Sequence, residues 1–497
     1  MKHTDWQRRA EGQAFIDTAL IAGRAQTAVD GQTFEVIDPA TNRLLARVAA
    51  CAEAEVDQAV RVARRAFEQG VWANMPPRDR KAILLRLADL LMAHREELAL
   101  LDAMSMGKPV MDAYNLDVPG AASVLAWYGE ALDKLYDQVA PTTRTALATI
   151  TRVPLGVIAA VVPWNFPLDM AAWKLAPALA AGNSVVLKPA EQSPFSALRL
   201  AQLALEAGVP EGVLNVVTGL GEQAGRALGM HPDIDALAFT GSTAVGKLFM
   251  QYAAQSNLKQ VWLECGGKSP NLVFADCRDL DLAAEKAAFG IFFNPGQVCS
   301  ANSRLLVQRE IHDEFVARLV DKTRHWQPGD PLDPASPMGA IVNARQTERI
   351  LGYIAEASAS SARLVSGGEQ LTINGSNNFI QPTIFTHVSP GQALAREEVF
   401  GPVLAVTAFD HEDEAVALAN DHIYGLAASV WSDDLNRAHR VARRLNAGTI
   451  SVNTVDALDV TVPFGGGKRS GFGRDLSLHS FDKYTQLKTT WFQFRQD

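Results

Sequence analysis

The chain has 497 residues, of which 48% are hydrophobic and 20% are charged, and its net charge is −9. This length predicts two or three domains, and the composition is typical of a soluble globular enzyme. Acidic and basic residues are interleaved and no long basic run occurs, which argues against nucleic acid and against an anionic membrane surface as partners.

The first part of the chain predicts short strands followed by amphipathic helices. Residues 14–50 alternate apolar and polar side chains between Asp-Gly and Asp-Pro turns, as short strands do. Residues 53–70 carry apolar side chains at helical spacing and stop at a glycine. A longer helix is expected from residue 78 to the Gly-Lys-Pro sequence at 107–109.

Strands and helices then alternate regularly, which predicts parallel sheets covered by helices on both faces. A second alternating region covers residues 271–452, so we expect two α/β domains that share one cleft. In the first region the expected strands are 156–162, 184–188, 213–217, 234–239 and 260–264, and the expected helices are 169–181, 194–207, 222–229 and 243–254.

Polar or Gly- and Pro-rich segments follow each strand of the first region. One such segment is equally well an ordinary turn, but five in series predict a shared crevice, because ligands bind at the carboxyl ends of parallel strands. The segments are 163–167, 188–194, 218–223, 240–246 and 264–270.

Two of these strand ends suit a dinucleotide. Gly241 and Ser242 open a helix, whose free N–H groups favour a phosphate. A carboxylate at Glu191, three residues after Lys188, can accept a ribose hydroxyl and would repel an added phosphate, which favours NAD over NADP. The alternative is a surface ion pair between these two side chains. The glycine-rich sequence from Gly219 has one residue too many for the dinucleotide fingerprint and is interpreted as a turn that starts a helix.

The four cysteines are dispersed, with no CxxC spacing and no histidine cluster beside them, so we expect no metal site. Dispersed thiols, an N-terminus without a signal-like apolar core and the lack of a bilayer-spanning run together predict a cytoplasmic protein. Inert packing is the ordinary role of a lone cysteine and is assigned to Cys51, Cys265 and Cys277. Cys299, in the sequence NPGQVCSANSR, has a polar, flexible setting that suits a reactive thiol.

The ordered motifs PWNFP, KPAEQSP, FTGSTAVGK, LECGGKSPNLVFAD, GQVCSANSRLLVQ, EEVFGPVL and TVPFGGGKRSGFGRD resemble those of the aldehyde dehydrogenase superfamily. The resemblance runs from about residue 20 to the C-terminus. It implies an α/β fold with a Rossmann-type NAD-binding domain (1–136 and 152–265), an α/β catalytic domain (266–475) and a small β oligomerisation element (137–151 and 476–497). From that element we expect a dimer or a dimer of dimers, the latter being a homotetramer.

The resemblance also implies a two-step oxidation of an aldehyde to a carboxylic acid. Cys299 matches the nucleophile that forms a thiohemiacetal and then a thioester, and Asn165 matches the side chain of the oxyanion hole. Glu264 matches the general base that activates water, and Lys174 and Asp475 match positions that relay protons from it. The positions implied for NAD, with NADP less favoured, are Pro163, Trp164, Lys188, Glu191, Gly221, Gly241, Ser242, Gly266, Glu398 and Phe400.

Within the superfamily, residues 433–491 most resemble the bacterial γ-glutamyl-γ-aminobutyraldehyde dehydrogenases of polyamine breakdown, relatives of ω-aminoaldehyde enzymes. One or more acids are expected to attract the positive end of an aminoaldehyde, Asp169 first; its alternative role is a helix N-cap or a solvent-facing residue. A general aliphatic or betaine-type aldehyde dehydrogenase and a non-redox thiol acyl-transferase or esterase remain alternatives. The positions implied for the small-molecule substrate are Phe166, Asp169, Trp173, Phe293, Asp456, Asp459 and Phe464.

Overall fold

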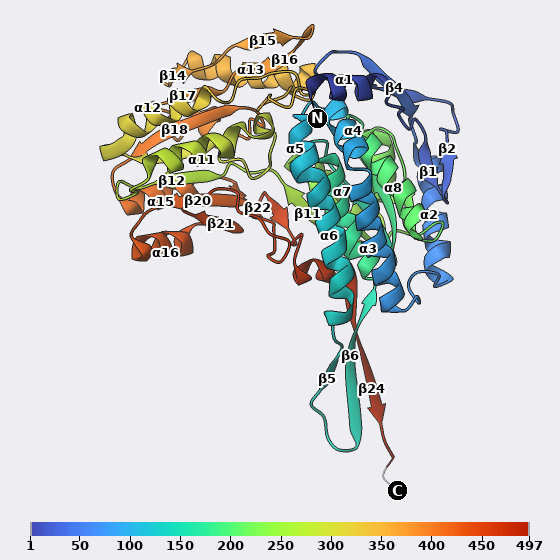
Figure 1. Ribbon diagram of the computed structural model, residues 1–497. Coiled ribbons are helices and arrows are strands. Elements are labelled where there is room, and N and C mark those ends of the chain that lie inside the picture. The colour runs from blue at the N-terminus through green and yellow to red at the C-terminus, as the bar shows by residue number, and fades with distance from the viewer. Residues whose placement is uncertain (1, 496–497) are drawn as a thin grey trace.

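The computed structural model describes residues 2–495. Two α/β bodies lie side by side, and a long β arm projects from the first of them (Figure 1). Within residues 2–495, no helix is both long and apolar enough to cross a membrane.

The first body is built on an eight-stranded sheet whose five central strands are parallel, as predicted. Their residues are almost all buried, because helices cover both faces. At one edge β1 (Ala19–Ile21) and β2 (Arg24–Gln26) pair antiparallel, and at the other β23 (Gly471–Phe472) does so. The central strands, in spatial order, are β9 (Leu214–Val216), β8 (Ser184–Lys188), β7 (Val157–Val161), β10 (Ala236–Gly241) and β11 (Gln260–Cys265).

The long helix expected from residue 78 is two helices, which corrects that prediction. The chain leaves helical geometry at His94, with φ −100° and ψ 20°. The imidazole Nδ1 of His94 lies 2.9 Å from a carboxylate oxygen of Glu97. Glu97 and Glu96 make the first turn of the second helix acidic, which favours a helix N-terminus at this point. The helices of this body include α2 (Glu53–Glu68), α3 (Pro77–Ala93), α4 (Arg95–Met106), α6 (Val118–Ala131), α7 (Pro167–Ala180), α8 (Phe195–Ala207) and α10 (Thr243–Gln255).

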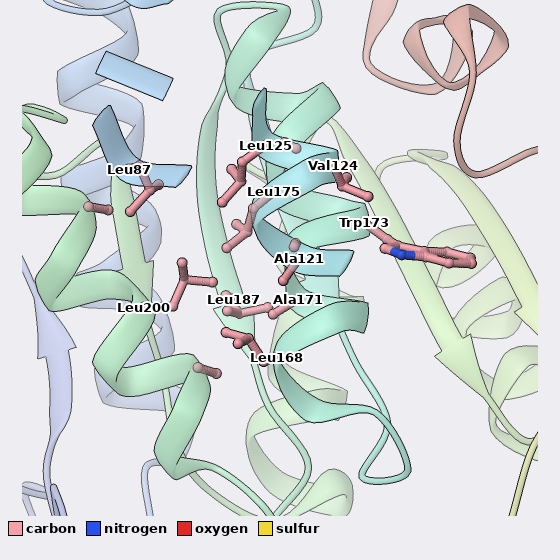
Figure 2. Close-up of a cluster of buried hydrophobic side chains, with 14 of the residues drawn as sticks. Leu87, Ala121, Val124, Leu125, Leu168, Ala171, Trp173, Leu175, Leu187 and Leu200 are labelled. Carbon is pink, nitrogen blue, oxygen red and sulfur yellow. The ribbon is translucent and has the colours of Figure 1, made fainter. Parts of the chain in front are cut away.

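Helix α7 lies between the hydrophobic core of the first body and the cavity of the candidate active site. Figure 2 shows Leu168, Ala171 and Leu175 of α7 among the apolar side chains of α3, α6, α8 and β8. The ring of Trp173 points away from this cluster (Figure 2). The buried side of α7 therefore fixes the orientation of the residues that it presents on its opposite side.

The second body repeats the alternation that the sequence predicted, on a seven-stranded sheet. All neighbouring strands are parallel except β14, which pairs antiparallel with β17. Its strands, in order, are β14 (Arg363–Ser366), β17 (Thr383–Thr386), β18 (Val403–Phe409), β13 (Arg304–Gln308), β12 (Pro270–Val273), β20 (Ala427–Trp431) and β21 (Thr449–Val452). Its helices include α11 (Leu280–Phe292), α12 (His312–Thr323), α13 (Ala344–Ser358), α15 (Glu412–Asn420) and α16 (Leu435–Arg444).

The β arm joins two segments that are far apart in the sequence. β6 (Ala146–Pro154) pairs antiparallel with β5 (Gln138–Ala140) on one side and with β24 (Thr485–Gln493) on the other. Figure 1 shows these strands extending beyond both sheets. Val139, Leu487 and Trp491 are 70%, 65% and 60% exposed, so the arm carries large apolar side chains on its surface.

Candidate active site

A cavity of about 640 Å³ opens at the carboxyl ends of β7, β10 and β11. Residues of both α/β bodies line it, as the shared cleft predicted from the sequence requires. Most of the predicted site residues meet here. Those among the lining residues are Pro163, Trp164, Asn165, Phe166, Asp169, Trp173, Gly241, Ser242, Glu264, Gly266, Phe293, Cys299, Glu398, Phe400, Asp456 and Phe464.

Cys299 differs from the other three cysteines, because they are buried and it is half-buried on the cavity wall. Its setting is less polar and open than the sequence suggested. Burial raises the pKa of the Cys299 thiol well above its ordinary value, and the carboxylates of Glu264, Asp456 and Glu398 raise it further. The free protein therefore holds this sulfur as a thiol, and a positive charge brought into the cavity would favour the thiolate.

Asn165 lies where the chain leaves β7, and its side chain is buried against the cysteine loop. Its amide Nδ2 donates to the carbonyl oxygen of Gln297 over 2.9 Å, and Asn294 Nδ2 donates to the Asn165 carbonyl over 3.0 Å. An amide NH₂ has two hydrogens. These contacts fix the group while leaving one donor for a ligand atom in the cavity.

Glu264 is the penultimate residue of β11 and lies beside Thr240 of β10 in the parallel register. It is 5% exposed, and neither carboxylate oxygen has a hydrogen-bond partner among residues 2–495. Burial raises the pKa of Glu264 to about 8, although the Lys174 ammonium opposes this shift. A carboxyl that titrates this close to neutrality can both accept and release a proton in turnover.

Lys174 and Asp475 lie behind Glu264 rather than on the main cavity wall. The Lys174 ammonium donates to Asp475 Oδ2, and Lys483, which sequence reasoning did not single out, donates to Asp475 Oδ1. All three line a small cavity that also includes Glu264.

The residues at the mouth of β10 and β11 fit a dinucleotide. Ser242 caps α10, with Oγ accepting from Val245 N–H over 3.3 Å, and the buried Thr240 hydroxyl next to it has no partner among the described residues. A Cβ at Gly266 would collide with the Glu398 carboxylate, which accepts from Gly267 N–H over 3.0 Å. The glycine therefore leaves room for the Glu398 carboxylate in this position.

Aromatic rings complete that end of the cavity. The rings of Trp164 and Phe400 meet edge to face with 5.4 Å between centroids. Phe400 has a φ of 56°, a left-handed conformation that is costly for a bulky residue and is often found at functional sites.

Three predicted cofactor residues lie outside the cavity lining. Gly221 begins a π-helical turn (Gly221–Gly225), in line with the interpretation of its segment as a helix start. Lys188 is buried, and its Nζ lies 3.8 Å from Glu191 Oε2. The pair exists, but a surface ion pair does not describe it, because only the glutamate is partly exposed.

Comparison with known proteins identifies the family to which this chain belongs. Residues 26–490 match the aldehyde dehydrogenase family. The chain belongs to this family. It is an enzyme that oxidises aldehydes with a nicotinamide cofactor, and the acyl-transferase or esterase alternative loses its support.

Three relatives of this aldehyde dehydrogenase match over nearly their whole length. The NADP/NAD-dependent aldehyde dehydrogenase PuuC of Escherichia coli is 52% identical over 486 residues, 98% of this chain and 97% of that protein. The crystal structure of γ-glutamyl-γ-aminobutyraldehyde dehydrogenase from Burkholderia cenocepacia has a TM-score of 0.98 and 54% identity, and covers 100% of both chains. The structure of Pseudomonas syringae indole-3-acetaldehyde dehydrogenase with NAD⁺ and IAA has a TM-score of 0.98 and 52% identity, covering 99% of this chain and 100% of that one.

Two further pairs of aromatic rings line the cavity of the dehydrogenase. Phe166 and Phe293 lie with centroids 6.2 Å apart, and Trp173 and Phe464 meet edge to face at 5.5 Å. Asp456, at a φ of 47°, accepts from Ser300 Oγ over 2.7 Å.

Asp169 lies in the first turn of α7, but Phe166 is the N-cap. Asp169 Oδ1 is buried without a partner among the described residues, and the side chain as a whole is half-buried on the cavity wall. Neither alternative role, N-cap or solvent-facing residue, therefore describes it. Burial, together with the nearby Asp117 carboxylate, raises the pKa of Asp169 to about 8. Asp459, by contrast, is exposed, accepts from Thr461 and is absent from the lining.

Sequence reasoning missed the π-helical turn Ala113–Asp117, which brings Asn115, Leu116 and Asp117 to the cavity. Asp117 pairs with the buried Lys108 ammonium, which also lies 3.9 Å from the centre of the Phe166 ring. These contacts join distant segments. The local sequence gives no sign of these contacts except that an acid, Asp117, directly precedes a Val-Pro pair.

Proposed function

We propose that this enzyme oxidises an ω-aminoaldehyde or γ-glutamyl-γ-aminobutyraldehyde to the corresponding carboxylic acid, as a step of polyamine catabolism. The observation that carries the proposal is the Asp169 carboxylate on the wall of an aromatic cavity, with one oxygen unpartnered. The names of the Burkholderia cenocepacia relative and of PuuC support the same reading.

The charges around Asp169 favour a cationic substrate. Four acids, Asp102, Asp112, Asp117 and Asp169, surround the single ammonium of Lys108, and burial raises the pKa of each acid. One lysine cannot compensate four carboxylates, so some remain protonated. A substrate ammonium beside Asp169 would supply the missing positive charge.

The covalent chemistry is assigned to Cys299 and Asn165. The Cys299 thiol first gives its proton to water in the cavity. The thiolate sulfur then attacks the aldehyde carbon, and a C–S bond forms as the C=O double bond opens and its oxygen becomes negative. The free hydrogen of the Asn165 amide and the Cys299 backbone N–H stabilise this oxygen. Loss of a hydride from the thiohemiacetal leaves a thioester on Cys299.

Glu264 is assigned to the hydrolytic step. Its carboxylate takes a proton from water as the water oxygen bonds to the thioester carbon. The C–S bond then breaks, which releases the acid and restores the thiolate. Lys174 and Asp475, directly behind Glu264, carry the proton away.

We propose NAD as the cofactor, in preference to NADP. When bound, NAD⁺ accepts the hydride. Glu191 next to Lys188 suits the adenosine ribose, Gly241 and Ser242 at the start of α10 suit the pyrophosphate, and Glu398 with Phe400 suits the nicotinamide ribose. Remaining contacts are assigned to Pro163, Trp164, Gly221 and Gly266.

An arylacetaldehyde is the second candidate substrate. The cavity wall is rich in aromatic rings, and the Pseudomonas syringae relative is named for indole-3-acetaldehyde. Asp169 is the feature that argues against it, because an uncharged aromatic group would leave the carboxylate unpartnered.

We also propose that the cytoplasmic enzyme assembles as a dimer or a dimer of dimers through the segments 137–151 and 476–497. The exposed apolar side chains of β5 and β24 support this, because a bare strand edge is stabilised by pairing with another chain. Sedimentation velocity on the enzyme and on a Trp491→Glu variant tests it. A monomeric wild-type enzyme would contradict it.

A panel of aldehydes tests the substrate. γ-Glutamyl-γ-aminobutyraldehyde, 4-aminobutanal, butanal and indole-3-acetaldehyde are each assayed with NAD and NADP by absorbance of the reduced cofactor. The proposal predicts the highest kcat/KM for an aminoaldehyde with NAD. A higher value for butanal or indole-3-acetaldehyde would contradict it.

A further inference from the structure

Asp475 is held between two buried lysines. Lys174 comes from α7 and Lys483 from the end of a 3₁₀ helix (Leu478–Lys483), and each ammonium donates to one carboxylate oxygen. The backbone of Asp475 exchanges hydrogen bonds of 2.8 and 2.7 Å with Phe464. Lys483 is 3% exposed, so its charge requires compensation inside the protein.

The charge balance links Lys483 to Glu264. Lys174 alone neutralises Asp475, so a second ammonium is in excess unless Glu264 is ionised. With Glu264 as a carboxylate, two acids face two lysines and the group is neutral. Burial lowers the pKa of Lys483 to about 8 and raises that of Glu264 to about 8, so a proton moves between them at little cost.

Two cavities adjoin these groups. Glu264, Lys174, Asp475 and Lys483 line an internal cavity of about 10 Å³, which is close to the space one water molecule needs. Lys483 also lines a second cavity of about 450 Å³, whose wall includes the exposed side chains of His479 and Asp482.

The other polar and charged groups near Lys483 make contacts of their own. Arg474 lines both cavities, but its guanidinium donates to backbone carbonyls and does not deprotonate. Asp482 pairs with Arg152 at 2.7 Å. The Tyr484 ring centre lies 5.2 Å from Lys483 Nζ, and the Tyr128 hydroxyl donates to the Ser477 carbonyl over 2.9 Å. Lys483 is thus the one described group that both lines the two cavities and exchanges protons near neutral pH.

We propose that Lys483 is a positioning residue for thioester hydrolysis. It balances the charge of ionised Glu264 through Asp475 and Lys174, and it is the point at which the proton taken from water leaves through the 450 Å³ cavity. Lys483 releases a proton to solvent and regains one from the Glu264 side, so no net charge accumulates. This inference rests on the proposed role of Glu264 as the base.

The test compares Lys483→Met with Lys483→Arg and with Lys259→Met in the full-length enzyme. Lys259 is a matched control because it is buried, its pKa is likewise lowered to about 8 by burial, and it donates to the Gly229 carbonyl over 2.6 Å. It directly precedes β11 and comes five residues before Glu264, about 16 Å along an extended chain.

Stopped-flow absorbance separates the first turnover of NADH from the steady state. A direct general base contributes about 10²–10⁴-fold to the rate. Because Lys483 acts on the base Glu264 only indirectly, we expect Lys483→Met to have a smaller effect and to lower the steady-state rate about tenfold. Its first turnover stays within about twofold of wild type, because hydride loss precedes hydrolysis. The pH at which its steady-state rate is half-maximal should rise, since Glu264 loses a balancing charge. Lys483→Arg restores the charge balance but not the proton exchange, and we expect an intermediate rate. Lys259→Met leaves both phases unchanged.

Equal loss in both phases, or no loss in either, overturns the proposal. If Lys483→Met does not fold, Lys483→Gln keeps a donor toward Asp475 without an exchangeable charge, and the same two rates decide. Failure of the underlying function is distinct, since wild-type enzyme would then form no NADH in the first turnover.

Discussion

Replacement of Asp169 by asparagine tests the proposed substrate most sharply. The change keeps shape and a polar group but removes the carboxylate whose Oδ1 has no partner among the described residues. We expect kcat/KM to fall for 4-aminobutanal and to stay within about twofold for butanal, because only the first carries an ammonium group.

The magnitude follows from the charge and the pKa of Asp169. A hydrogen bond to a charged group contributes about 1.5–3 kcal/mol, which corresponds to about 10- to 150-fold in kcat/KM. With a pKa of about 8, ionising Asp169 at pH 7 costs about 1.4 kcal/mol. Binding of the cation is therefore weaker at pH 7 than at pH 8.5. The preference for aminobutanal should rise with pH through about 8 in the wild type and be flat in Asp169→Asn.

The assay is NADH absorbance at pH 7 and 8.5 for wild type, Asp169→Asn and Asp459→Asn. Asp459 is a control because it is an exposed acid that does not line the cavity and is already bonded to Thr461. An unchanged aminobutanal-to-butanal ratio in Asp169→Asn, or an equal drop in Asp459→Asn, would refute the reasoning.

Three further outcomes are expected. Asn165→Ala removes an oxyanion donor and should lower kcat by about 10²–10³-fold, with NAD binding by fluorescence quenching unchanged; a loss below threefold would argue against this role. In the wild type kcat should rise with pH through about 8, because Glu264, with its raised pKa, acts as a base only when ionised. Glu264→Gln should abolish that rise while keeping the first turnover of NADH. Glu191→Gln removes the carboxylate that disfavours a ribose phosphate, so the ratio of kcat/KM for NAD to that for NADP should fall; a rise would contradict the assignment.

Periodicity and turn chemistry predicted most of the fold, because buried parallel strands and amphipathic helices leave local signals. The alternation from Val157 to Cys265 appears as predicted, and the same logic located the strand ends that line the cavity. The break at His94 was missed because helical spacing continues through it, and the structure reveals it in the backbone angles of His94 and in its contact with Glu97.

The features of the site that could not be predicted from the sequence depend on contacts between residues that are far apart in the chain. Asp117 reaches the cavity only because a π-helical turn redirects it and Lys108 holds it there. Lys483 and Lys174 are 309 residues apart in sequence and meet on one carboxylate. The setting of Cys299 was expected to be polar, and the burial and nearby acids that raise its pKa come from three separate segments.

The account depends on a covalent bond between substrate carbon and the sulfur of Cys299. Wild-type enzyme turning over NAD and aldehyde is quenched in acid during the steady state, digested and analysed by mass spectrometry. The account predicts an acyl group of the substrate on the peptide that contains Cys299, and none on peptides with Cys51, Cys265 or Cys277. An acyl group on another cysteine, or a Cys299→Ser enzyme that reduces NAD at the wild-type rate, would contradict it.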